Sequence, residues 1–133
     1  MSEKKFQVTV FGKTGCDKCK IMNKRLEELL VKPEWQDFDK TYHDLETEDG
    51  LVAYCRTECI NPTRIPAMIV SKRNPTTGQY EFVTNPKPGQ PDPVLKRTRL
   101  YSWLGLQTDY SDQGQGVVSP KMLTSVLDEA RLL

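Results

Sequence analysis

The chain lacks the features that would point to a highly charged ligand or to a membrane. Its 19 basic and 18 acidic residues leave a net charge of +1, so the composition favours neither a nucleic-acid nor a membrane partner. The apolar stretch near the N-terminus, residues 6–11, is too short for a signal peptide or a membrane-spanning helix. We therefore expect a protein of the reducing cytoplasm. The single histidine, His43, is assigned no catalytic role.

Neither an internal repeat nor a second domain is visible in the sequence. The 133 residues suit one domain, residues 1–133, with one hydrophobic core. Cysteine is scarce as well, at four residues, and in a reducing compartment these four are not expected to form a structural disulfide framework. Because they stand in two close pairs, redox or metal chemistry is the better interpretation.

Hydrophobic periodicity predicts strands and helices in alternation, followed by a hairpin and a last helix. The predicted strands are 6–11, 38–43, 67–70 and 80–83. Helices are predicted from 17 to 31, from 47 to the break at Asn61–Pro62, and from Pro120 onwards. This order predicts an α/β fold, with a central mixed sheet of four strands flanked by helices. The segment 85–118 is expected to be an extended loop, with a short helix or a buried turn near Leu100.

The first cysteine pair lies directly after a predicted strand and opens a predicted helix. Free N–H groups and the helix dipole at that place favour a thiolate, which is the nucleophile in disulfide exchange. Lys13, Lys18 and Lys20 add positive charge nearby. Cys16 is therefore predicted to be the exposed, attacking cysteine. Cys19 falls on the apolar face, where it is placed to resolve a mixed disulfide at Cys16.

Other interpretations of the cysteines remain open. C-x-x-C is also half of a zinc site, and thiolates from Cys16, Cys19, Cys55 and Cys59 would suit zinc or an iron–sulfur cluster. Cys55 shares a predicted helix face with Leu51, which favours a small core residue. Alternatively, Cys55 and Cys59 form a second redox pair that accepts the disulfide from the first.

A proline opens the predicted buried strand at 67–70. If the bond between Ile65 and Pro66 is cis, the backbone of Ile65 would face Cys16 and could pair with an extended substrate as an added strand. An ordinary trans proline at the start of a strand is the alternative. Three further aromatic residues are interpreted as packing residues: Trp35, Trp103 and Tyr101. An exposed partner surface around Trp103 is the alternative.

The stretches V-T-V-F-G-K-T-G-C-D-K-C-K and R-I-P-A-M-I-V resemble the glutaredoxin and thioredoxin superfamily, over about residues 5–84. The resemblance implies a thioredoxin-like fold, with Cys16 as nucleophile and Cys19 as resolving cysteine. It also implies that Pro66 is a cis-proline, that Ile65 pairs with substrate and that Lys13 lies near a glutathione carboxylate. The Gly-Gly-acid pattern with which glutaredoxins hold glutathione is missing, which argues against glutathione binding.

Together these features predict a thiol–disulfide oxidoreductase that reduces protein or small-molecule disulfides. It would need no cofactor beyond an external thiol reductant, such as glutathione or a thioredoxin reductase. The alternatives are a zinc or iron–sulfur binding module, and a redox-sensing interaction protein that uses the segment 85–118 as its interface.

Overall fold

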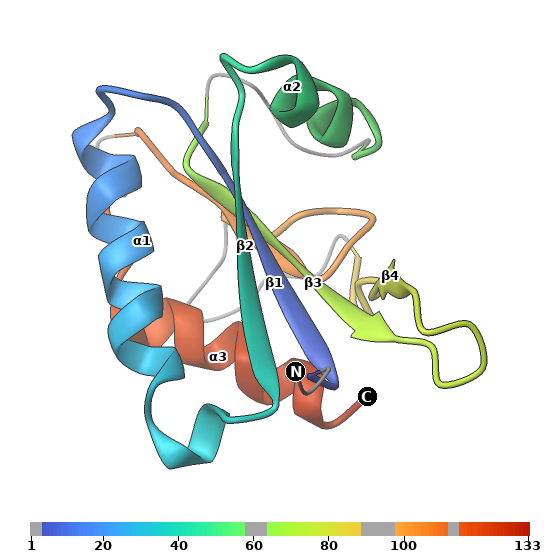
Figure 1. Cartoon of the computed structure of the whole chain (residues 1–133). Helices are drawn as coiled ribbons and strands as arrows, with labels where there is room; N and C mark the ends of the chain where they lie inside the picture. The colour runs from blue at the N-terminus through green and yellow to red at the C-terminus, as the bar shows by residue number, and fades with distance from the viewer. Residues whose placement is uncertain (1–3, 58–63, 89–97, 112–114) are drawn as a thin grey trace.

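The computed structural model describes residues 4–57, 64–88, 98–111 and 115–133 (Figure 1). The strands are β1 (Phe6–Gly12), β2 (Phe38–Asp44), β3 (Ala67–Arg73), β4 (Tyr80–Phe82) and β5 (Gly105–Gln107). The helices are α1 (Asp17–Leu30), α2 (Glu48–Cys55) and α3 (Pro120–Arg131), with a short 3₁₀ turn, η1 (Pro33–Trp35).

The strands form one mixed sheet in the order β2-β1-β3-β4. β1 and β2 are parallel and joined by α1, whereas β3 runs antiparallel to β1. The outer edge of β3 is shared by two short strands: β5 pairs with residues 67–69 and β4 with residues 71–73. The predicted four-stranded mixed sheet is therefore present, with β5 as an addition.

Helices cover the two faces of the sheet. α1 and α3 bury their apolar stripes against one face, where residues such as Met22, Leu26 and Leu127 pack on Val8 and Val10. α2 contributes Ala53 and Tyr54 to a smaller cluster on the other face, around Phe11, Ala67, Ile69 and Leu100. Figure 1 shows the same division, with α1 and α3 packed together and α2 set apart from them. This arrangement is the thioredoxin-like fold predicted from the sequence.

The segment before α3 is more regular than the predicted loop. Thr98 accepts a hydrogen bond at its carbonyl from the N–H of Gln107, and Arg99 forms a bridge with Leu106, so the chain folds back along β5. A bidentate ion pair between Arg99 and Glu129 fastens this turn to α3. The buried turn expected near Leu100 is therefore present, and it leads into a strand.

Two packing predictions are wrong. Leu51 and Cys55 were expected to face the core, but both are exposed, because α2 turns Ala53 and Tyr54 towards the sheet instead. Tyr101 is also exposed rather than packed, while Trp35 is buried and Trp103 packs against Phe82. No helix in the described part of the chain is long and apolar enough to cross a membrane.

Candidate redox site

The loop between β1 and α1 is built at the place where two parallel strands end together. Gly12 and Asp44 are paired at the ends of β1 and β2, and the N–H of Leu45 donates to the Gly12 carbonyl over 2.8 Å. Cys16 then serves as the N-cap of α1, with an extended backbone. The dithiol therefore begins just beyond the C-terminal ends of β1 and β2, where α1 starts.

Cys16 and Cys19 form a disulfide, with their Cα atoms 5.2 Å apart. Cys16 is half-buried, whereas Cys19 is only 1% exposed and belongs to the apolar face of α1. The N–H of Cys19 donates to Sγ of Cys16 over 3.1 Å. A thiolate at Cys16 would thus meet a backbone donor and the positive end of the helix dipole, both of which favour the charged form.

The loop is tied to β2 by a side-chain hydrogen bond. The hydroxyl of Thr14 donates to Oδ2 of Asp44 over 2.6 Å, and the N–H of Glu46 donates to Oδ1. The hydrogen bond from the Thr14 hydroxyl is the largest of the causes that lower the pKa of Asp44. Asp44 is therefore a fixed negative charge beside the loop that precedes Cys16.

Gly12 allows a close approach around the inner cysteine. A Cβ placed on Gly12 would lie 2.6 Å from the hydroxyl of Tyr42 and 3.1 Å from Sγ of Cys19. A side chain at residue 12 would therefore crowd both of these atoms. Burial, with a smaller contribution from the charge of Asp44, raises the pKa of Tyr42, so its hydroxyl stays protonated at neutral pH.

The loop before β3 has the expected proline geometry, because the Ile65–Pro66 peptide bond is cis. Its carbonyls accept hydrogen bonds from the segment that follows β5. The N–H of Thr108 donates to the carbonyls of Arg64 and Pro66, and its hydroxyl donates to Pro66 over 2.5 Å. The hydroxyl of Tyr110 donates to the carbonyl of Ile65, also over 2.5 Å.

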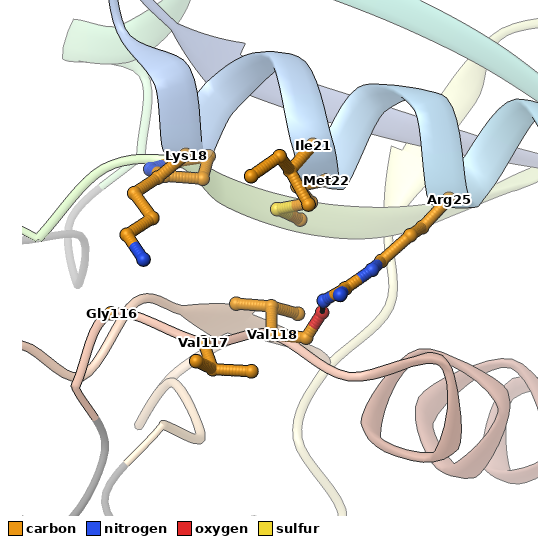
Figure 2. A pocket seen from close by; sticks show the side chains of 8 residues that line it. Lys18, Ile21, Met22, Arg25, Gly116, Val117 and Val118 are labelled. Carbon is orange, nitrogen blue, oxygen red and sulfur yellow. Dashed lines mark hydrogen bonds between the residues drawn. The ribbon is translucent and has the colours of Figure 1, made fainter.

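A small cavity separates α1 from the chain that leads into α3. Figure 2 shows Lys18 and Arg25 on the helix side and Val117 and Val118 on the other, with Arg25 donating to the carbonyl of Val118 over 2.8 Å. Its volume is about 50 Å³. Ligand pockets are commonly several hundred Å³, so this cavity is large enough for a few waters and too small for a substrate.

Of the other predicted site residues, two lie close to the dithiol motif, one lies at the end of α2 and one falls outside the described residues. Lys13 is exposed in the loop before Cys16, and Pro66 lines the small cavity together with Lys18. Cys55 is exposed at the end of α2, and Cys59 lies outside the described residues, so neither the second redox pair nor a four-cysteine metal site is defined. Within the described ranges, no three histidine, cysteine or acidic side chains gather as metal ligands.

Four residues of the site were not predicted from the sequence: Thr14, Tyr42, Asp44 and Tyr110. Thr14 lies in the loop before Cys16, and Tyr42 and Asp44 lie near the end of β2, beside that loop. The predicted parallel pairing of the two strands brings their ends together, but it does not show which side chains meet there. Tyr110 reaches Ile65 across 45 residues of sequence, and its segment has no periodicity that would have marked it.

No protein-family model and no curated protein matches the chain. Among solved structures it is similar to oxidised mitochondrial thioredoxin 3 from Saccharomyces cerevisiae, at 22% identity and a TM-score of 0.41, over 59% of this chain and 64% of that one. A structure concerned with thiol resolving in yeast mitochondrial 1-Cys peroxiredoxin gives 19% identity and a TM-score of 0.41, over the same shares. The poxviral disulfide oxidoreductase G4 gives 17% identity and a TM-score of 0.40, over 92% and 90%. The chain thus spans less than two thirds of the length of the first two.

Proposed function

We propose that this protein is a thiol–disulfide oxidoreductase that reduces protein or small-molecule disulfides in a reducing compartment. One observation carries the proposal: the disulfide joins a half-buried cysteine at a helix N-terminus to a buried cysteine one turn further in. A substrate can reach Cys16 from solvent, whereas Cys19 is shielded from any partner except a group already attached to Cys16.

The reaction follows from this difference in access. In the reduced protein, the thiolate of Cys16 attacks one sulfur of the substrate disulfide, and the other substrate sulfur leaves as a thiolate. Cys19 then loses its proton and attacks Sγ of Cys16, which forms the Cys16–Cys19 disulfide and releases the second substrate thiol. The substrate gains two electrons and the dithiol loses two. An external thiol reductant, such as glutathione or a thioredoxin reductase, returns them.

Single cysteine variants test the order of attack. We expect Cys16→Ser to abolish reduction of a disulfide substrate such as insulin, because the accessible nucleophile is gone. We expect Cys19→Ser to accumulate a mixed disulfide at Cys16, visible by mass spectrometry as an added mass that a reductant removes. Cys55→Ser is the matched control and should keep the activity of the parent. Full activity in both Cys16→Ser and Cys19→Ser would refute the proposal.

Metal content separates this function from the alternative of a metal-binding module. Protein purified without chelators should contain no stoichiometric zinc or iron, and mild oxidation should link Cys16 to Cys19 reversibly. About one zinc per chain, lost together with folding when a chelator is added, would favour a four-thiolate site instead.

A further inference from the structure

The loop that should receive a substrate backbone is already in contact with another part of this chain. In the proposed reaction, an extended polypeptide would pair with the backbone of Ile65 as an added strand while its disulfide meets Cys16. The carbonyls of Arg64, Ile65 and Pro66 instead accept hydrogen bonds from Thr108 and Tyr110. The segment after β5 therefore occupies the acceptors along this loop.

The hydrogen bonds donated by Thr108 and by Tyr110 differ in how easily they can be broken. Thr108 is fully buried and bonds Pro66 through both its N–H and its hydroxyl, so those bonds belong to the fold. Tyr110 is 48% exposed and reaches Ile65 through its side chain alone. Its hydroxyl can exchange the carbonyl for water by a rotation of the side chain, at the modest cost of one net hydrogen bond.

The ring of Tyr110 also lies near the end of the Lys18 side chain, a residue of the dithiol motif. A Cβ placed on Gly116 would be 2.9 Å from Cε1 of Tyr110 and 3.2 Å from Cε of Lys18. The ring thus lies against the backbone of Gly116, where Lys18 also reaches, and Lys18 stands between the two cysteines in the sequence. Burial raises the pKa of Tyr110, so the hydroxyl remains a donor throughout the neutral range.

We propose that Tyr110 is a specificity-determining residue that occupies the Ile65 carbonyl and so disfavours disulfides held in extended polypeptides, relative to compact low-molecular-weight disulfides. This inference rests on the proposed oxidoreductase function and narrows its substrate class. The hydroxyl of Tyr110 fills one of the two lone-pair positions of the Ile65 carbonyl, so the N–H of an extended peptide must compete with it for this acceptor. A small disulfide needs only access to Cys16, so Tyr110 does not penalise it.

Kinetics with two substrates test the proposal. Tyr110→Phe is compared with the parent on a mixed disulfide within an extended octapeptide and on 2-hydroxyethyl disulfide. For the peptide we expect a KM lower by about two- to tenfold, the range of one net hydrogen bond, with kcat for the small disulfide unchanged. Tyr110→Ala, which removes the ring as well, should lower the peptide KM at least as much. Tyr101→Phe removes a hydroxyl from another exposed tyrosine in the same part of the chain and should change neither value.

An unchanged or raised peptide KM in both Tyr110 variants would overturn the proposal, and so would an equal change for both substrates. A binding experiment separates this failure from failure of the proposed function. The same octapeptide with serine in place of cysteine cannot react, so its Kd is measured without turnover. We expect tighter binding to Tyr110→Phe than to the parent by the same factor, whether or not the protein reduces disulfides. Equal Kd values, or no binding by either protein, would overturn the role of Tyr110 alone.

Discussion

Asp44 shows how a single side chain holds the loop that presents the dithiol. Its carboxylate lies at the end of β2 and accepts hydrogen bonds from Thr14 and from the backbone of Glu46. Both bonds favour the ionised form, which is why the pKa of Asp44 is lowered although the carboxylate is open to solvent. The loop therefore depends on a charge that is present at neutral pH and lost in acid.

We expect Thr14→Val to raise the pKa of Asp44 towards its ordinary value, because the largest cause of the lowering is removed. The stability from this bond is present above the ordinary pKa and lost as the pH falls through the lowered one. Thr14→Val should therefore be less stable than the parent at neutral pH, and this difference should shrink as the pH falls through the lowered pKa of the parent. An NMR titration of the Asp44 carboxyl carbon measures the shift. Thr14→Ser keeps the hydroxyl as a control, and identical titrations of the valine and parent proteins would contradict the assignment.

Cys55 offers a second experiment on single residues, because its exposure differs from that of the dithiol. In the oxidised, folded protein, we expect iodoacetamide to alkylate Cys55 and to leave Cys16 and Cys19 unmodified. After mild reduction, Cys16 should be alkylated before Cys19, because Cys19 is buried. Peptide mapping by mass spectrometry locates the label. A folded protein whose Cys55 resists alkylation would contradict the exposed position at the end of α2.

Among the elements, α3 connects the core to the segment that reaches the site. Its apolar stripe, which includes Leu123 and Leu127, is buried under the sheet. Its start is defined by Ser119, whose hydroxyl accepts a hydrogen bond from the N–H of Met122 over 3.3 Å, with Pro120 at the first helical position. Near its other end, Glu129 holds Arg99 from the turn before β5.

We expect Ser119→Ala to lower the free energy of unfolding by about 1 kcal/mol, because a first-turn N–H loses its acceptor. Urea denaturation followed by circular dichroism measures the difference. Ser119→Asp retains an acceptor and adds a charge that suits the helix dipole, so it should remain close to the parent. If both variants lose the same stability, the hydroxyl is not acting as a cap.

The ion pair between Arg99 and Glu129 is predicted to be worth more than an exposed pair. Its two N–O distances are 2.6 and 2.9 Å, and the side chains are only 10% and 22% exposed. A double-mutant cycle with alanine at both positions should give a coupling energy of about 1–3 kcal/mol. The same cycle at Lys24 and Glu28, an exposed pair on α1, should give about 0.3 kcal/mol. Equal coupling at the two pairs would contradict this prediction.

Over the whole molecule, the sequence predicted what depends on local periodicity. The mixed sheet and the helices follow from alternating and helical patterns, and the position of Cys16 follows from the change of period after β1. The face of α2 that packs on the sheet was not predictable in this way, because an eight-residue helix has too few turns to define an apolar face. β5 was missed since three residues, Gly105 to Gln107, show no period, and they become a strand only by pairing with β3.

In the candidate site, too, local motifs were predictable from the sequence and long-range contacts were not. The dithiol and the proline are short local motifs, and the sequence located both. The contacts around them, from Asp44 to Thr14 and from Tyr110 to Ile65, join residues that only the folded sheet brings together. They depend on strand register and on loop conformation, and neither leaves a mark in a single sequence.

The divided outer edge of β3 has a consequence for how the protein opens. β5 covers residues 67–69 and β4 covers residues 71–73, and the two halves meet at Val70, which bonds both Leu104 and Val83. Amide hydrogen exchange along β3 should therefore report two local opening reactions rather than one. A ligand held at the loop of Ile65 would slow exchange in the half next to β5 and leave the half next to the β4 hairpin almost unchanged.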